Sequence, residues 1–191
     1  GDAVLWGQAL GAKLKDLSGY QGHGSFSIPY SIPITWALMT EGGIQLNVEG
    51  KRFSNEHFGY SEQAEKVLSQ PEGIAWNIYD QSRHEFAING FPEYRSAYKV
   101  GAIKNAKSIL ELAQVTKITE SQLKSTLSKV QSLYISGIDN YGRDFKSKKP
   151  LTPPYYAVKV TGALFHTQGG LVINELGQVF RHNGKLFPNL F

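Results

Sequence analysis

The stretch at residues 155–174, YYAVKVTGALFHTQGGLVIN, decides how the chain is organised. It follows two prolines, and residues that favour strands (valine, leucine and isoleucine) lie on both sides of a polar centre. Two adjacent glycines in that centre permit backbone conformations closed to other residues. The pattern predicts two short strands around a tight turn, where a flat ligand can approach the backbone closely beside His166 and Thr167. An ordinary hairpin that carries a surface histidine is the alternative.

The composition is that of a globular protein with one compact core. The 191 residues are 41% hydrophobic, yet no apolar run reaches the roughly 20 residues of a membrane span. The absence of cysteine excludes disulfides, thiolate chemistry and cysteine-bound zinc, and it fits a cytoplasmic protein. The net charge of +4 comes from scattered basic residues. The one basic cluster, Arg143–Lys149, has no aromatic ladder, which favours a solvated loop over nucleic-acid binding.

The start of the chain combines a helical and an extended pattern. A helix is expected to begin at Asp2 and to carry four apolar residues on one face, namely Trp6, Leu10, Leu14 and Leu17. The segment Ser18–Pro33 has no helical period and predicts a loop or an extended strand, with Gln21 and His23 on one face.

The remaining patterns predict an α+β fold, in which a small mixed β-sheet packs with a helix pair. Strands are expected at Trp36–Thr40, Gly43–Val48, Gly73–Tyr79 and Gln178–Arg181. A short amphipathic helix is expected at Ser61–Gln70. The helix pair begins with SILELAQ at Ser108. Its second helix has Thr119 and Gln122 as a capping box and stops at Gly137.

Several familiar chemistries are excluded by the residues alone. The sequence contains no GxGxxG, Walker, GxSxG or HExxH motif. Its five histidines lack metal-ligand spacing, so no metal site is predicted. The candidates for acid, base or anion-binding roles are His23, His57, Tyr60 and His166.

Two separated motifs resemble the flavoproteins of the fumarate reductase and succinate dehydrogenase superfamily, which includes flavocytochrome c fumarate reductases and 3-ketosteroid dehydrogenases. The first is GGIQLNVEGKRFSNE at residues 42–56, which matches the family pattern at Gly43, Leu46, Asn47, Gly50, Arg52, Phe53, Asn55 and Glu56. The second matches a Tyr-Tyr-Ala and His-Thr-x-Gly-Gly pattern at Tyr155, Tyr156, Ala157, His166, Thr167, Gly169 and Gly170. The intervening helix pair is similar to that of the family's capping domain, so the likeness covers nearly the whole chain.

The resemblance implies that the chain is a fragment of an FAD-dependent oxidoreductase. Residues 1–20 would be a helical edge of the FAD domain, residues 21–154 the capping domain that closes over the substrate, and residues 155–191 the return into the FAD domain. The main FAD site would lie outside the chain, so the isolated fragment is expected to be inactive. The implied partners are a small-molecule substrate and the rest of the FAD domain, and the electron partner is unspecified.

The resemblance also assigns roles to individual residues. His23 and His166 correspond to the family's substrate-binding histidines. The other residues implied to bind substrate are Gln21, Thr40 and Thr167, and those implied to bring backbone close to the flavin are Gly169 and Gly170.

Tyr60 is the informative departure from the family pattern. Fumarate reductases carry a proton-donating arginine four residues beyond the Asn-Glu pair, whereas ketosteroid dehydrogenases have a tyrosine there. Tyr60 is therefore the expected catalytic acid or base, and packing at a domain interface is the alternative. The expected reaction reduces or forms an activated C=C bond, on an organic acid similar to fumarate or succinate. A ketosteroid-type dehydrogenase and a cap that only gates substrate are the two alternatives.

Overall fold

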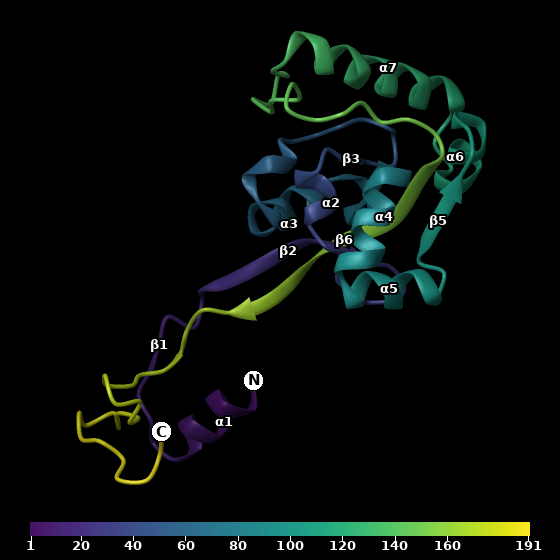
Figure 1. The fold of residues 1–191 in the computed structure, drawn as a ribbon. Helices are drawn as coiled ribbons and strands as arrows, with labels where there is room; N and C mark the ends of the chain where they lie inside the picture. The colour runs from purple at the N-terminus through teal and green to yellow at the C-terminus, as the bar shows by residue number, and fades with distance from the viewer. The chain divides into compact units, whose positions relative to one another are not determined.

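The computed structural model describes residues 1–191 and divides them into two compact units (Figure 1). The larger unit is Gly22–Ala163, and the smaller unit combines Gly1–Gln21 with Leu164–Phe191. Strands β2 (Tyr20–Ser27) and β6 (Tyr155–Thr167) each run from one unit into the other, so the chain passes between the units twice.

Strand β4 (Ile74–Asp80) lies in the middle of the sheet of the larger unit, and all seven of its residues are buried. It pairs antiparallel with β3 (Ile44–Leu46) on one side and with β6 on the other. Strand β5 (Ile103–Ala106) also pairs antiparallel with β6, and β2 is an outer strand. The nearly unbroken apolar run of β4 fits its place, because a strand covered on both faces has no polar side.

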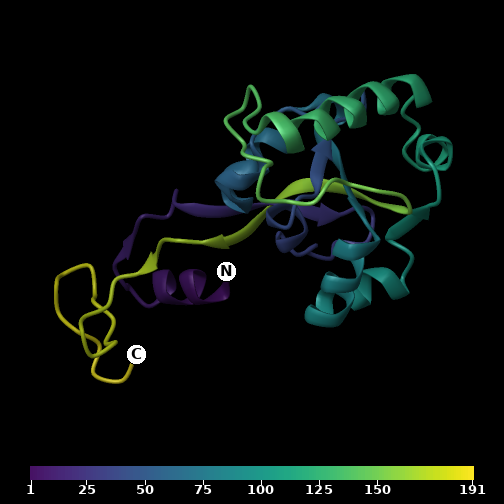
Figure 2. The ribbon, with the colours of Figure 1, turned by 45° about the horizontal axis from the view of Figure 1, so that its top comes forward.

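Successive side chains on the central strands pack alternately into two separate cores. Tyr79 of β4 and Val158 of β6 belong to one core, and their neighbours Ile78 and Ala157 belong to the other. The helices of this unit are α2 (Ala37–Thr40), α3 (Tyr60–Leu68), α4 (Gln81–Gly90), α5 (Pro92–Lys99), α6 (Ile109–Thr116) and α7 (Glu120–Ser136), with 3-10 turns η1 (Glu56–Phe58) and η2 (Pro71–Gly73). Figures 1 and 2 show α7 on one side of the sheet and α4 and α5 on the other. The predicted α+β class is therefore confirmed, whereas the sheet predicted to be mixed is antiparallel where β3, β4, β5 and β6 pair.

The helix pair α6 and α7 begins where the capping signals predict. The Ser108 hydroxyl accepts a hydrogen bond from the Glu111 N–H at 3.2 Å, and the Thr119 hydroxyl accepts one from the Gln122 N–H at 3.3 Å. Helix α7 ends at Gly137, whose φ of 105° lies outside the range that side chains favour. Both helices share a core with β3 and β4, so the predicted packing of the pair on the sheet is confirmed.

The cap of α7 gives a first stability prediction. Thr119→Ala removes the oxygen that satisfies a free N–H of the first turn, and it should lower the free energy of unfolding by about 1 kcal/mol. Urea unfolding followed by circular dichroism measures the change. Ser128→Ala on the exposed face of the same helix is the control, and it should leave stability unchanged or slightly raised. Equal effects at both positions would contradict the role of the cap.

The strand predicted at Trp36–Thr40 is wrong, because this segment forms the short helix α2. The Thr40 N–H donates to the Trp36 carbonyl at 3.2 Å, which is helical spacing. Leu38 and Met39 are both fully buried. The apolar run WALM is too short for its period to distinguish a strand from a single helical turn.

The smaller unit packs one helix against a short two-stranded sheet. Helix α1 (Asp2–Ala9) lies beside β7 (Gly170–Leu171), which pairs antiparallel with β1 (Leu14–Lys15). A side chain at Gly7 would overlap the side chain of Leu171, so glycine allows α1 and β7 to lie close together. The buried core of this unit consists of Ala12, Val179 and Phe187. In neither unit is a helix both long and apolar enough to cross a membrane.

Two expectations for the smaller unit are wrong in extent. The first helix ends at Ala9 instead of continuing to Leu17, because Gly11 takes a φ of 80° that terminates it and Leu14 enters β1. The strand predicted at Gln178–Arg181 is reduced to isolated bridges, one of which joins Val179 to Ile173.

The two strands predicted within residues 155–174 do not form a hairpin. Residues 155–167 are one continuous strand, β6, and its partners are β2, β4 and β5. Strand β7 pairs with β1 instead of folding back on β6. The local pattern predicted extended structure, but it placed the turn too early, since Phe165, His166 and Thr167 still belong to β6. The partners of both strands come from distant segments that the pattern could not reveal.

Candidate functional site

His23 and Tyr60, two of the residues predicted to take part in the chemistry, lie side by side in the larger unit. Their ring centroids are 4.9 Å apart and the rings are inclined by 30°. The rings of Phe26 and Trp36 meet His23 edge-on, at centroid distances of 5.4 and 6.5 Å. These four residues form an aromatic cage, in which His23 is only 6% exposed.

The cage depends on two glycines that flank His23 on β2. A Cβ at Gly22 would lie 2.5 Å from the Cβ of Ala64, and one at Gly24 would lie 2.7 Å from the backbone of Gln63. Both of these neighbours belong to α3, which begins at Tyr60. The alternation Gly-His-Gly therefore lets α3 lie against β2, and this contact brings the two rings together.

The hydrogen bonding of His23 fixes which ring nitrogen carries the proton. Nδ1 accepts the backbone N–H of Ser25 at 3.1 Å, so the neutral ring carries its proton on Nε2. Burial lowers the pKa of His23 to about 4. At neutral pH the residue is therefore an uncharged hydrogen-bond donor.

A buried cluster around Glu56 holds the segment that leads into Tyr60. The Glu56 carboxylate accepts hydrogen bonds from Arg52, from Arg143 at 2.8 Å and from the Gln45 N–H at 3.0 Å. The indole N–H of Trp36 donates to the Glu56 carbonyl at 3.1 Å, which ties the aromatic cage to the same residue. The positions that carried the first family motif are thus used for structure around the candidate site.

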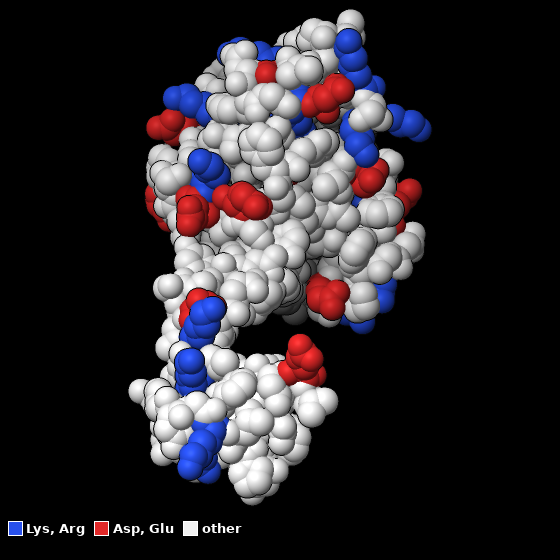
Figure 3. Space-filling view, turned by 90° about the vertical axis from the view of Figure 1, so that its left-hand side faces the viewer, with Lys and Arg blue, Asp and Glu red and all other residues white.

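The charges of this Glu56 cluster are balanced. Burial alone would raise the pKa of Glu56, but the charges of Arg143 and Arg52 outweigh it and lower that pKa to about 2. Arg52 also binds Asp139, so two arginines face two carboxylates. The prediction that the basic cluster Arg143–Lys149 is a solvated loop is wrong at Arg143, because this residue is only 1% exposed. On the face of the larger unit drawn in Figure 3, positively and negatively charged side chains are interspersed.

A second buried network joins α3 to the sheet. The Gln63 amide donates to Gln45 at 2.8 Å and hydrogen-bonds Ser54, and Asn77 on β4 donates to the Ser25 hydroxyl at 2.7 Å. Because Ser25 also donates its N–H to His23, the orientation of the His23 ring is fixed by the sheet itself.

The other predicted residues of the larger unit lie outside the aromatic cage. Thr40 is exposed at the end of α2, and its hydroxyl donates to the Ala37 carbonyl at 3.1 Å. His57 lies in η1 and is exposed as a residue. Partial burial of its ring is the main cause that lowers its pKa, and the charge of Arg143 lowers it further. The substrate-binding role of Thr40 stays a prediction.

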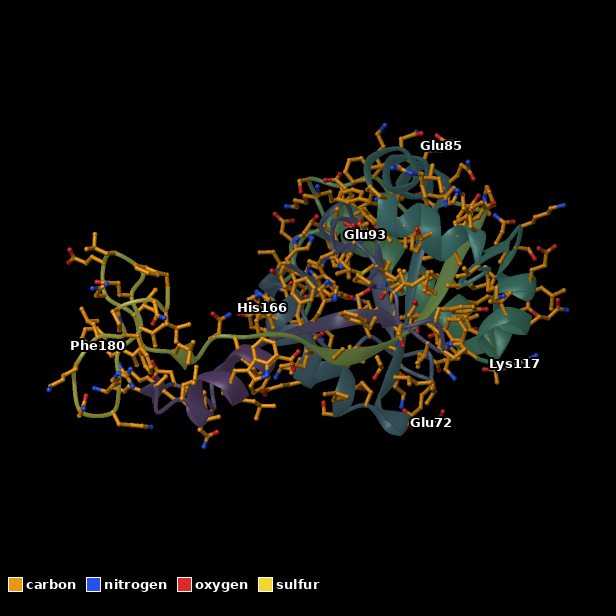
Figure 4. The ribbon with its side chains drawn as sticks, turned by 90° about the horizontal axis from the view of Figure 1, so that it is seen from below. Glu72, Glu85, Glu93, Lys117, His166 and Phe180 are labelled. Atoms are coloured by element: carbon orange, nitrogen blue, oxygen red, sulfur yellow. The ribbon has the colours of Figure 1, made fainter.

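The remaining predicted site residues belong to the smaller unit, and they are Gln21, His166, Thr167, Gly169 and Gly170. His166 and Thr167 are exposed near the end of β6, where Figure 4 labels His166. A side chain at Gly169 would overlap the Asp16 carbonyl, so that glycine serves the packing of the unit. A side chain at Gly170 would meet no other atom of the chain, and the approach of a flavin to Gly169 and Gly170 stays a prediction.

Sequence reasoning missed the residues that build the site around His23 and Tyr60. The Gly-His-Gly alternation of residues 22–24 was a readable signal of close backbone approach. Arg143 had no such signal, because its partner Glu56 lies 87 residues earlier in the chain. Phe26 and Trp36 also gave no sequence signal of a site, since aromatic residues at those positions are typical of an ordinary core.

The pKa of His23 predicts how stability depends on pH. Unfolded histidine binds a proton below about pH 6.5, whereas folded His23 resists it to about pH 4, so stability should fall as pH drops through this window. At about 1.4 kcal/mol per pKa unit the loss is at most about 3 kcal/mol. In urea unfolding at several pH values, His23→Gln should flatten the slope. His182→Gln, at an exposed position, is the control. An unchanged slope in His23→Gln would contradict the buried neutral state.

The fold and these residues define a domain of an FAD-dependent flavoprotein oxidoreductase. The chain belongs to the family of FAD binding domains, whose family model matches residues 1–191. FAD is accordingly its cofactor, and the resemblance to fumarate reductases and ketosteroid dehydrogenases is confirmed.

Three known proteins illustrate the relationship. The chain is 29% identical to a probable fumarate reductase of Shewanella frigidimarina, over 100% of the chain and 32% of the relative. It is 27% identical to a 3-oxosteroid 1-dehydrogenase of Mycobacterium tuberculosis, over 100% of the chain and 40% of the relative. The solved structure of a flavocytochrome c3 fumarate reductase in an open conformation superposes with a TM-score of 0.78 at 26% identity, over 100% of this chain and 33% of that one. The chain thus spans about a third of the length of the fumarate reductases that it matches.

Proposed function

We propose that the chain closes the substrate site of an oxidoreductase that reduces or forms an activated C=C bond. In this proposal residues 21–154 are the capping domain, and residues 1–20 and 155–191 adjoin the FAD domain. The family match and the fumarate reductase relatives support hydride chemistry on FAD. The observation that carries the proposal to particular residues is the contact between the half-buried Tyr60 and the buried His23, whose ring centroids are 4.9 Å apart.

Tyr60 is the proposed proton donor and acceptor. When bound, FAD would provide the hydride chemistry at one carbon of the substrate. In the direction of reduction, the Tyr60 phenol gives its proton to the adjacent carbon, so that C=C plus hydride plus proton becomes CH–CH. The resulting phenolate recovers a proton from solvent. In the reverse direction Tyr60 removes the proton from carbon.

The histidines are proposed to hold the substrate. His23 is proposed to hydrogen-bond a carboxylate or carbonyl oxygen of the substrate, and that bond would polarise the double bond toward hydride addition. His166 and Thr167 are proposed as anchors contributed by the smaller unit, with Gln21 and Thr40 as further substrate-binding positions. Gly169 and Gly170 are proposed to bring backbone near the flavin.

The leading substrate is an unsaturated organic acid, which the fumarate reductase relatives favour. Tyr60 favours a second candidate, a ketosteroid-type dehydrogenase, since the similarity to 3-oxosteroid 1-dehydrogenases extends over the whole chain. A third possibility is a cap that gates substrate without activity of its own.

Flavin content and acceptor reduction test the proposal together. The longer protein that contains this chain should carry FAD and reduce unsaturated acids, while the 191 residues alone should bind little flavin. Stoichiometric FAD on the isolated chain would contradict the placement of the main flavin site. Preference for a 3-ketosteroid over every acid tested would favour the second candidate.

A further inference from the structure

We propose that a cleft beside α7 binds a small organic acid in which a carboxylate is joined to a flat apolar body, such as an aromatic carboxylate. The cleft, called here the α7 cleft, is lined by residues of α7, by residues 138–141 that follow this helix, and by Lys51 and Arg52. Its volume is about 580 Å³, which lies within the roughly 300–1,000 Å³ of small-molecule sites. All of its lining residues belong to the larger unit, and none belongs to the aromatic cage.

The wall formed by residues 138–141 is fixed by hydrogen bonds of its own. The Asp139 carboxylate accepts the N–H of Tyr141 at 2.9 Å and the N–H of Arg143 at 2.8 Å, and it also binds Arg52. The Tyr141 hydroxyl donates to the Arg52 carbonyl at 2.9 Å. Both ends of Tyr141 are therefore held, so a ligand that meets its ring does not have to order this wall first.

The α7 cleft exposes apolar surface that a ligand can cover. The Arg52 guanidinium lies over the Tyr141 ring, 5.7 Å from its centroid, yet 43% of Tyr141 is exposed. Ile138 is 68% exposed, and Leu133 adds half-buried apolar surface from α7. An aromatic ring stacked on Tyr141 would remove part of this surface from water, which favours a flat apolar body.

The charges that line the cleft are unequal. Three cations, Lys51, Arg52 and Lys129, stand against one carboxylate, that of Asp139. Asp139 and Arg52 bind each other. Lys51 contacts Glu49 at 2.9 Å, but both side chains are more than half exposed, and exposed pairs of this kind contribute little. The cleft therefore keeps a surplus of positive charge, which attracts an anion.

Lys129 is the proposed anchor of the carboxylate. No aspartate or glutamate occurs from Ser121 to Ser136, so α7 places no acidic side chain within one turn of Lys129. Ser125, one turn earlier, is exposed and also lines the cleft. An ammonium group and a hydroxyl one helical turn apart supply charge-assisted and neutral hydrogen bonds for the two oxygens of one carboxylate.

Two matched ligands test the proposal in the full-length, FAD-loaded protein. 2-Naphthoate has the carboxylate and the flat body, and 2-naphthamide replaces only the charge. In isothermal titration calorimetry at low ionic strength, 2-naphthoate should bind at least tenfold more tightly than 2-naphthamide, and added salt should reduce this advantage. Equal affinities, or no binding of 2-naphthoate at millimolar concentrations, would overturn the proposal.

Variants of the cleft locate the bound acid. Lys129→Gln, at an exposed position, should weaken 2-naphthoate at least tenfold and leave 2-naphthamide unchanged. Lys124→Gln removes the same charge from the same helix outside the cleft, and it should leave both affinities unchanged. Tyr141→Ala should weaken both ligands at least fivefold. If Lys129→Gln bound 2-naphthoate as tightly as the unchanged protein does, the acid would lie elsewhere, and the proposal would be wrong.

Discussion

Replacing Arg143 with methionine should lower the free energy of unfolding by about 3 kcal/mol or more. The substitution keeps apolar bulk but removes the charge that faces Glu56 at 2.8 Å, and it leaves two buried carbonyls, of Met39 and Gly43, without their donor. Both losses occur where water cannot compensate, because Arg143 is 1% exposed. Urea unfolding of the purified protein measures the change.

An exposed ion pair is the matched control for Arg143. Lys124→Met breaks the contact with Glu120 at 2.7 Å on α7, where the lysine side chain is 61% exposed. Its cost should be below about 1 kcal/mol. If Arg143→Met cost no more than Lys124→Met, the Glu56 cluster would not be the support of the 52–60 segment that the structure indicates.

Tyr60→Phe should slow turnover of the full-length enzyme about a hundredfold or more, because it removes the proposed proton donor. The aromatic ring stays in place against His23, so folding and flavin content should be preserved. Rapid mixing of the reduced enzyme with an unsaturated acid measures the rate of flavin oxidation. The expected loss is in kcat, with KM nearly unchanged, since the substitution keeps the aromatic ring in place.

Tyr30→Phe is the control for Tyr60→Phe. Tyr30 is 38% exposed and lies outside the aromatic cage, so loss of its hydroxyl should not affect turnover. Equal rates for Tyr60→Phe and the unchanged enzyme would remove Tyr60 from the chemistry and leave it a packing residue beside His23.

Local signals predicted the parts of the fold that depend on neighbouring residues. The caps at Ser108 and Thr119 and the stop at Gly137 are properties of short segments, and each is found where the sequence placed it. The buried strand β4 was equally readable, because an apolar run covered on both faces needs no partner to be recognised.

Long-range contacts explain what the sequence could not predict. The run WALM becomes helix α2 in a core shared with distant helices, and residues 164–171 find their strand partners near the start of the chain instead of in each other. Arg143 was assigned to a solvated loop because its partner Glu56 lies far away in sequence. Its burial is visible only when both segments meet.

The candidate site divides in the same way. His23 and Tyr60 were identified through the family resemblance, which compares positions and not contacts. The two residues meet because Gly22 and Gly24 have no side chain, so that α3 can pack against β2. The residues that enclose the pair, Phe26 and Trp36, carried no signal of their own. The sequence therefore identified the residues proposed for the chemistry, but it did not identify the residues that surround them.

A single-turnover experiment tests the central claim most directly. The full-length protein, with its flavin reduced and oxygen excluded, is mixed with a limiting amount of an unsaturated acid such as fumarate. We expect one flavin to be oxidised for each C=C bond converted to CH–CH, with the saturated product recovered in equal amount. A flavin that stays reduced, or one that is oxidised without formation of saturated product, would contradict the account.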